Sequence, residues 1–232
     1  MWSGGAALAG GATVGMTPTA EYAGPAATLF PRAGDRSAKV QSFRALGRTG
    51  WQVSDVAMGT NRLRESAVVR YALDKGVNLI DTAEGYQRGE TERVIGEALQ
   101  HVDRSSVFIH DRMRIGDDDT EEAIVNRVRG SLERLQTDYI DLYQIHWPSR
   151  TVPLEETVAA LERLRAQGKV RALGVSNFGL NDLSDLLQLE LGWFESNQLP
   201  YNLLWRMIES QILPACAARR IGVLAYSPLM HG

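Results

Sequence analysis

Short apolar segments alternate with amphipathic segments from Phe43 onward, and this alternation constrains the fold more than any other feature of the sequence. Seven mainly continuous apolar segments predict strands, at residues 54–58, 77–80, 106–109, 139–145, 170–175, 194–199 and 222–226. Continuous apolar character is typical of parallel strands that helices cover on both faces. The sequence therefore predicts an α/β protein with a parallel sheet.

Between these segments, apolar residues such as Ile124 and Val128 recur at spacings of three and four, which predicts amphipathic helices. Gly76, Gly168 and Gly222 follow helical segments, so we expect each to end a helix in the left-handed conformation. The unit that repeats is therefore a strand followed by a helix.

Such a repeat can form an open doubly wound sheet or a (β/α)8 barrel. No G-x-G-x-x-G motif follows the first predicted strand, which removes the main argument for the open sheet. We therefore expect a (β/α)8 TIM barrel, with functional residues at the carboxyl ends of its strands. Residues 44–53, with Thr49 and Gly50 at their centre, predict an N-terminal β-hairpin that could plug the bottom of the barrel.

Residues 1–42 differ in composition from the rest: Gly, Ala, Thr and Pro dominate, and no basic residue precedes Arg32. We interpret them as a disordered or signal-like leader that precedes a barrel domain over 43–232. Residues 4–16 resemble the apolar region of a signal peptide in length and small side chains, but they lack a charged start. We expect a cytoplasmic protein, or an exported one if the leader is a remnant signal sequence.

The net charge of −3 argues against a nucleic-acid partner, because 25 basic side chains stand against 28 acidic ones. Nothing in the sequence indicates a membrane partner. The single cysteine, Cys216, lies in an apolar helical pattern, so we expect a buried, inert thiol rather than a nucleophile or metal ligand.

Polar side chains with chemical potential follow several predicted strands. Asp81 ends the second strand and Tyr86 follows after a short loop, while His146 follows the apolar fourth strand. A tyrosine can act as a general acid if its surroundings lower its pKa from about 10. The alternatives are that Asp81 is a turn or capping residue, Tyr86 a rim aromatic and His146 a structural histidine.

Amide and hydroxyl side chains follow the fifth, sixth and seventh strands: Ser176, Asn177, Gln198 and Tyr226. Such groups can hold a carboxamide, and a tyrosine ring offers a flat face on which an aromatic ring can stack. Together they are consistent with a nicotinamide-binding site.

The sequence resembles the aldo-keto reductases from about Phe43 to its end. The resemblance rests on LGRTG, GVNLIDTAEGY, GETERVIGEAL, DYIDLYQIHWP, GKVRALGVSNF, NQLPYN and GVLAYSPL, which occur in the order typical of the family. It implies a barrel that binds NADP(H) across its carboxyl rim and transfers hydride between this cofactor and a carbonyl or alcohol.

The resemblance also implies roles for individual residues. Asp81, Tyr86 and His146 match three of the family's four catalytic positions; Ser176, Asn177 and Gln198 match its contacts to the nicotinamide carboxamide; Tyr226 matches the stacking aromatic; Ser227 and Leu229 match the loop at the pyrophosphate. No metal site is implied.

The fourth catalytic position of the family is a lysine at the end of the third strand, where this sequence has Arg112. The only lysines, Lys39, Lys75 and Lys169, lie far from the predicted rim. An arginine keeps a positive charge beside Asp81 and Tyr86 but does not give up a proton. We expect Arg112 to pair with Asp81 and to lower the pKa of Tyr86; the alternative is a solvated residue at the strand end.

The sequence stops at Gly232, in the loop after the seventh predicted strand. The part from Phe43 onward is shorter than the ~200 residues that such a barrel needs. We therefore expect a barrel that lacks its eighth strand, has exposed edges and self-associates, and we interpret the chain as a fragment or a degenerate member of the family.

The sequence thus predicts an NADP(H)-dependent oxidoreductase that acts on a small carbonyl substrate, whose identity is not readable from the residues. Two alternatives remain: a catalytically impaired barrel that binds nucleotide as a sensor or regulatory protein, and a nonfunctional fragment.

Overall fold

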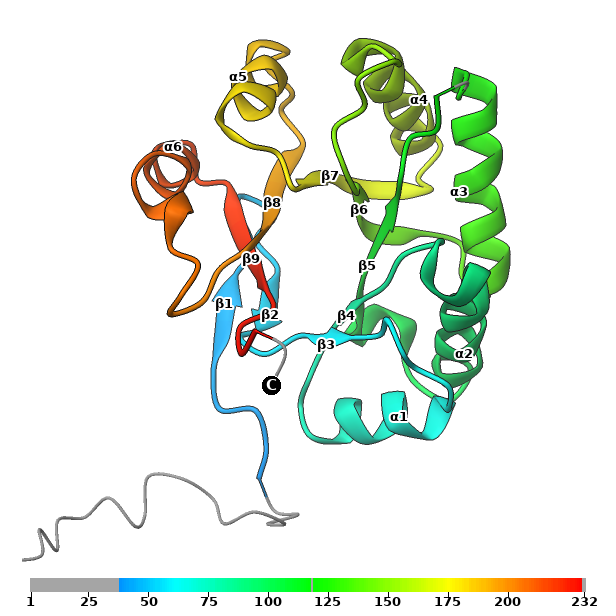
Figure 1. Cartoon of the computed structure of the whole chain (residues 1–232). Coiled ribbons are helices and arrows are strands. Elements are labelled where there is room, and N and C mark those ends of the chain that lie inside the picture. Colours follow the sequence, from blue (N-terminus) through cyan, green and yellow to red (C-terminus); the bar gives the residue numbers. More distant parts are fainter. Residues whose placement is uncertain (1–37, 118, 231–232) are drawn as a thin grey trace, which may run out of the picture. The chain divides into compact units, whose positions relative to one another are not determined.

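The computed structural model describes residues 38–117 and 119–230, and its contacts separate Met1–Ala38 from Lys39–Gly232. Most of the predicted leader, residues 1–37, lies outside the described residues. In the second unit, seven strands form one parallel sheet in the order β3-β4-β5-β6-β7-β8-β9, beside a separate antiparallel pair, β1-β2. The helices lie outside the curled sheet (Figure 1), which confirms the predicted α/β class and hairpin.

The strands are β1 (Phe43–Ala45), β2 (Gln52–Ser54), β3 (Met58–Gly59), β4 (Leu79–Asp81), β5 (Phe108–Met113), β6 (Ile140–Ile145), β7 (Val170–Ser176), β8 (Phe194–Pro200) and β9 (Gly222–Tyr226). The α-helices are α1 (Ser66–Asp74), α2 (Glu90–Leu99), α3 (Glu121–Leu135), α4 (Leu154–Ala166), α5 (Leu180–Gln188) and α6 (Ile212–Ala218). Short 3-10 turns occupy Tyr86–Gly89, Arg104–Ser106 and Met207–Glu209.

The prediction of a first parallel strand over 54–58 is wrong in its extent. Ser54 belongs to the hairpin, and only β3, Met58–Gly59, pairs with β4. The side chain of Asn78 accounts for the difference, because its Oδ1 accepts a hydrogen bond of 2.7 Å from the backbone N–H of Ser54. This bond joins the last residue of the hairpin to the residue that precedes β4.

Two of the three predicted glycine caps are confirmed, since Gly76 and Gly168 have φ values of +90° and +70°. The third is wrong: Gly222 lies in β9, and Arg220 takes the left-handed conformation after α6 instead, with a φ of 54°. Gly222 has a different use. A Cβ at this position would lie 2.9 Å from Cδ1 of Leu46, so its absence lets the hairpin approach β9.

The hairpin closes the amino ends of the strands. Leu46 and Val53 pack with Leu79, Leu142 and Ala172 in a cluster separate from the main core, which lies between sheet and helices. Arg48 fixes the hairpin to β8, because its backbone N–H donates to Oε2 of Glu195 at 2.5 Å. The carboxyl ends of the strands are therefore the open face for a site.

Two further sequence expectations concern burial. Cys216 is 1% exposed, and burial raises the pKa of its thiol to about 11, as expected for an inert cysteine. Among residues 38–117 and 119–230, no helix has both the length and the apolar character needed to cross a bilayer.

Candidate active site

A cavity of about 520 Å³ opens at the carboxyl ends of the strands. It contains all four predicted catalytic side chains and most of the predicted nicotinamide contacts. Its lining includes Asp81, Tyr86, Arg112, His146, Ser176, Asn177, Gln198, Tyr226 and Ser227. A cavity of this size is within the range of small-molecule and cofactor sites.

Arg112 joins the predicted acid and its carboxylate partner. Its Nη2 donates to Oδ1 of Asp81 at 2.6 Å and to the phenol oxygen of Tyr86 at 2.7 Å. Arg112 is only 4% exposed, so the alternative of a solvated strand-end residue is wrong. The guanidinium occupies the place at which the sequence predicted a positive charge.

Two further side chains support Asp81 from inside the sheet. Nε2 of Gln198 donates to Oδ2 of Asp81 at 2.6 Å, and Nδ1 of His110 lies 3.0 Å from the same oxygen. Gln198 also accepts a hydrogen bond from Nη1 of Arg112 through its Oε1. Asp81, Arg112 and Gln198 thus form a closed ring of three side chains.

His110 and this ring together determine the charge state of Asp81. Burial alone would raise the pKa of Asp81, but the electrostatic interactions with His110 and Arg112 and the hydrogen bonds from His110 and Gln198 outweigh it. The pKa of Asp81 therefore lies below its usual value. Asp81 is an anion at neutral pH and holds Arg112 beside the phenol.

The expectation for Tyr86 is wrong in its net direction. Burial raises the pKa of the Tyr86 phenol and outweighs Arg112, which lowers it as expected; the negative charge of Asp81 adds to the rise. Tyr86 is therefore a neutral phenol at working pH. Because Arg112 donates to its oxygen, the proton of Tyr86 remains available for another acceptor.

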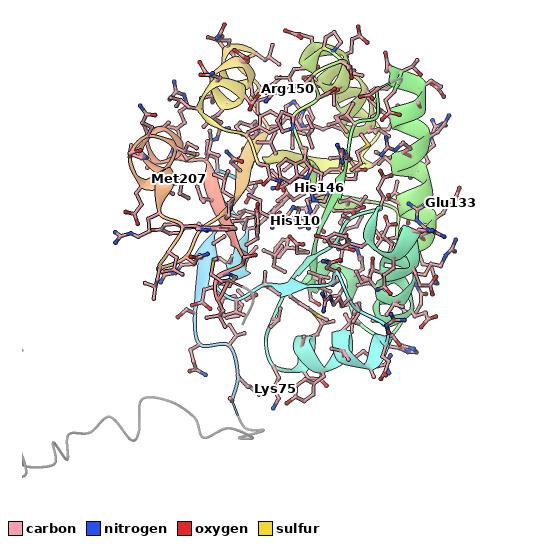
Figure 2. All side chains as sticks on the ribbon, in the orientation of Figure 1. Lys75, His110, Glu133, His146, Arg150 and Met207 are labelled. Carbon is pink, nitrogen blue, oxygen red and sulfur yellow. The ribbon has the colours of Figure 1, made fainter. Side chains whose placement is uncertain are left out.

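His146 lies beside this phenol as a neutral imidazole. Its ring meets the ring of Tyr86 edge-on, with 6.2 Å between the centroids. Burial, followed by the positive charge of Arg112, lowers the pKa of His146 to about 4. Figure 2 labels His146 and His110 near the centre of the ring of strands, away from the exposed Met207.

The predicted nicotinamide contacts form a chain of hydrogen bonds. Tyr226 donates from its hydroxyl to Oδ1 of Asn177 at 2.8 Å, and Nδ2 of Asn177 lies 3.0 Å from Oγ of Ser176. Asn177 has a φ of 63°, which turns its amide toward the cavity after β7. Ser227 lines the same cavity, whereas Leu229 is 81% exposed and does not line it.

Five residues near this cavity were not singled out from the sequence. Thr60, Asn61, Arg62 and Trp147 line the cavity, and His110 lies beneath it against Asp81. The first three directly follow β3, and Trp147 follows His146, so their position at strand ends was a usable signal. His110 could have been found by strand alternation, which places it on the same face as Arg112.

These residues fit the nicotinamide end of NADP(H). Ser176 and Asn177 offer hydroxyl and amide groups at the cavity, and the ring of Tyr226 lies beside them. The amides of Gln198 and Asn177 already have partners at both ends: Gln198 bonds to Asp81 and Arg112, and Asn177 bonds to Tyr226, Ser176 and the backbone oxygen of His146. A bound carboxamide would therefore have to replace some of these contacts. In the described residues, no cluster of His, Cys, Asp and Glu could hold a metal ion.

Comparisons with known proteins agree with this geometry. The family model described as "Aldo/keto reductase family" matches residues 46–232. Methylglyoxal reductase YeaE of Escherichia coli is 43% identical over 189 residues, which cover 81% of this chain and 65% of that protein. Aldo-keto reductase YhdN of Bacillus subtilis is 36% identical, over 81% of this chain and 57% of its own length. The chain thus spans less than two thirds of each of these relatives.

Solved structures support the same assignment. A thermostable aldo-keto reductase in complex with the inhibitor epalrestat has a TM-score of 0.77 and 32% identity, over 82% of this chain and 73% of its own. An aldo-keto reductase from Klebsiella pneumoniae in complex with NADPH has a TM-score of 0.73 and 35% identity, over 82% and 69% respectively. The fold, the strand-end side chains and the extent of the sequence match lead to one conclusion: the chain belongs to the aldo/keto reductase family.

Proposed function

We propose that this chain carries the catalytic centre of an NADP(H)-dependent carbonyl reductase. Tyr86 donates its phenol proton to the carbonyl oxygen of the substrate. Bound NADPH supplies the hydride that adds to the carbonyl carbon. The product is an alcohol, which leaves through the cavity at the strand ends.

The residues around Tyr86 prepare this proton transfer. Arg112 donates to the phenol oxygen at 2.7 Å, so it stabilises the negative charge that develops there as the proton leaves. Asp81 keeps Arg112 in place through its ionised carboxylate. His146 is neutral, so one ring nitrogen can donate to the carbonyl oxygen and orient it toward Tyr86.

One observation carries the proposal: a single guanidinium nitrogen bridges a buried carboxylate and the oxygen of a half-buried phenol. A phenol held in this way is oriented as a proton donor rather than as a rim aromatic. After transfer, Tyr86 regains its proton from water in the cavity, because an arginine holds its protons too tightly to give one up at neutral pH.

Oxidation of NADPH by the purified chain in the presence of aldehydes tests this function. A relative that is 43% identical is named methylglyoxal reductase, so methylglyoxal and a nitrobenzaldehyde are the first substrates to try. NADPH deuterated at C4 should transfer deuterium to the carbonyl carbon of the product, as mass spectrometry can detect. Transfer of solvent hydrogen to that carbon would contradict hydride transfer from the cofactor.

A second candidate is a barrel that binds the nucleotide without turning it over. Arg112 favours this binding function, because an arginine cannot pass a proton to Tyr86 as a lysine could. Gln198 favours it as well, because its amide is already bonded to Arg112 and Asp81. Fluorescence titration with NADPH distinguishes the two functions. Saturable binding without oxidation across a panel of aldehydes would favour the sensor.

We further propose a cytoplasmic location and a small-molecule carbonyl as the only substrate. The single, buried Cys216 is consistent with a reducing compartment. Self-association is part of this proposal, and light scattering of the purified chain tests it. A monodisperse monomer would contradict it.

A further inference from the structure

Gln198 occupies a position that changes how Arg112 and Asp81 can meet. An arginine and a carboxylate tend to pair through two parallel hydrogen bonds, one from each terminal nitrogen of the guanidinium to one carboxylate oxygen. Here only Nη2 of Arg112 reaches Asp81, at Oδ1. The amide of Gln198 stands between the other two atoms: its Oε1 accepts from Nη1 of Arg112, and its Nε2 donates to Oδ2 of Asp81 at 2.6 Å.

This arrangement leaves one contact of Arg112 for the phenol. Nη2 carries two hydrogens, and they serve Oδ1 of Asp81 and the oxygen of Tyr86. If Nη1 and Nη2 both turned toward Asp81, the guanidinium plane would rotate away from Tyr86. All three members of the ring are at most 8% exposed, so solvent does not compete for these contacts.

We infer that Gln198 is a positioning residue that holds the Arg112–Asp81 pair to a single shared contact and so reserves an N–H of Arg112 for the oxygen of Tyr86. The inference rests on the proposed reductase function of this site, but it concerns contacts within the chain itself. It also assigns Gln198 a place that differs from the carboxamide contact implied by the family resemblance.

The other groups that face Tyr86 do not depend on Gln198. His146 meets the Tyr86 ring edge-on, and Tyr226 adds a second phenol near it. Nδ1 of His110 lies 3.0 Å from Oδ2 of Asp81, and in the described residues His110 forms no hydrogen bond with Arg112. A change at position 198 therefore reaches Tyr86 through Arg112.

The test is the ionisation of the phenol at position 86, followed in the chain without cofactor. A trifluorotyrosine incorporated there ionises in a range that the folded protein tolerates, and its own fluorine resonance reports the titration. In Gln198→Met, which keeps the length of the side chain but cannot bridge, we expect this phenol to ionise about one pH unit higher, because Arg112 leaves it. If the Gln198→Met variant does not fold, Gln198→Asn replaces it in the test. This variant keeps the amide, but its side chain is too short to bridge Arg112 and Asp81, so the titration should shift in the same direction.

Two controls separate positioning from a general disturbance. Gln144→Met removes another buried amide, whose Nε2 donates to Oγ of Ser196 at 2.9 Å. Gln144 lies opposite Arg112 on the neighbouring strand, but in the described residues its amide makes no hydrogen bond to the guanidinium, so this variant should leave the titration unchanged. In an Arg112→Lys background, Gln198→Met should also leave the titration of the phenol unchanged, because a lysine has one ammonium nitrogen and no pair of nitrogens for Gln198 to keep apart.

An unchanged titration in both Gln198 variants would overturn the inference. The same shift in the Arg112→Lys background would also overturn it, because the effect would then not pass through Arg112. Failure of the reductase function itself would show as a lack of aldehyde-dependent NADPH oxidation by the unsubstituted chain. That outcome is read in a separate assay and leaves the fluorine titration interpretable.

Discussion

Asp111 and Arg112 are consecutive residues of β5, yet their side chains belong to two separate buried clusters. The inner cluster consists of Asp81, Tyr86, Arg112 and Gln198, at the cavity. The outer cluster consists of Glu92, Asp111, Arg134 and Tyr143, and Glu92 and Arg134 place it under α2 and α3 (Figure 1). Both clusters contain a carboxyl group shielded from solvent.

The pKa values of the two carboxyl groups are shifted in opposite directions. Burial raises the pKa of Asp111, and the negative charge of Glu92 raises it further, so it lies well above its usual value. Nε of Arg134 donates to Oε2 of Glu92 at 2.6 Å, whereas in the described residues no cation forms a salt bridge with Asp111. Oδ2 of Asp111 and Oε1 of Glu92 have no hydrogen-bond partner in the described residues, and one shared proton would satisfy both. Burial acts in the same direction on both sides of β5; the neighbouring charge decides the result.

The largest effect should come from removing the phenol of the inner cluster. Tyr86→Phe should lower kcat for aldehyde reduction by about 10³-fold, because it removes the general acid, and should leave the affinity for NADPH nearly unchanged. Steady-state kinetics and fluorescence titration measure the two quantities. The matched control is Tyr143→Phe in the outer cluster, which should reduce aldehydes at the normal rate. Equal loss in both variants would mean that Tyr86 does not donate the proton.

Removing the inner carboxylate should cost stability as well as activity. Asp81→Asn leaves the buried Arg112 without an anion, which should lower the free energy of unfolding by about 3 kcal/mol at pH 7. The pKa of Asp81 is lowered in the folded chain, so its contribution is present above the unfolded pKa of about 4 and is lost as the pH falls through the folded value. Urea unfolding at several pH values should show the two proteins converge in acid. A constant difference down to low pH would argue against an ionised Asp81.

Exchanging the cation tests whether the inner cluster lacks a proton relay. Arg112→Lys introduces a compact ammonium that can pair with Asp81 and give up a proton, so kcat should rise about tenfold, equivalent to ~1.4 kcal/mol. The pH dependence of kcat should also gain a basic limb. A lower kcat would show that the three contacts of the arginine matter more to the reaction than a relay does.

The smallest effect should come from neutralising the outer cluster. The pKa of Asp111 is raised in the folded chain, so the wild type loses stability as the pH rises from about 4 through the folded value. The Asp111→Asn variant has no carboxyl group to ionise, so it keeps its stability as the pH rises. Its Tm at pH 8 should exceed that of the wild type by about 2–4 °C, the shift that ~1 kcal/mol produces in a domain of this size. Scanning calorimetry at pH 5 and pH 8 measures the difference, which should shrink at the lower pH. A lower Tm at pH 8 would mean that Asp111 is ionised and paired.

Much of the fold was predictable because the strand–helix repeat is local. Apolar runs and helical periodicity indicated all seven parallel strands, and Thr49–Gly50 indicated the hairpin. The errors lie where a contact between residues far apart in the sequence determines the local structure. Asn78 takes a hydrogen bond from Ser54 and shortens the first parallel strand, and Leu46 approaches Gly222 from the other end of the chain. Neither contact leaves a signal in the neighbouring residues.

The sequence was sufficient to predict which residues form the candidate site, but not the hydrogen bonds that join them. Strand ends and motifs indicated Asp81, Tyr86, Arg112 and His146, which the structure brings to one cavity. The ring through Gln198 depends on the reach of an arginine across the sheet, from β5 to β8. The net pKa shift of Tyr86 depends on the balance between burial and charge, which residue identity does not determine.

The contact between the hairpin and β9 has a consequence for the order of folding. Gly47 and Gly222 approach closely enough that a Cβ on Gly222 would lie 3.1 Å from the backbone nitrogen of Gly47. A ribosome synthesises the hairpin before β3 to β7, and its contact surface on β8 and β9 only after them. Contacts between residues so far apart in sequence form slowly, because loop closure must precede them. The hairpin therefore docks only after β8 and β9 have been synthesised, and its docking covers the amino-terminal end of the sheet.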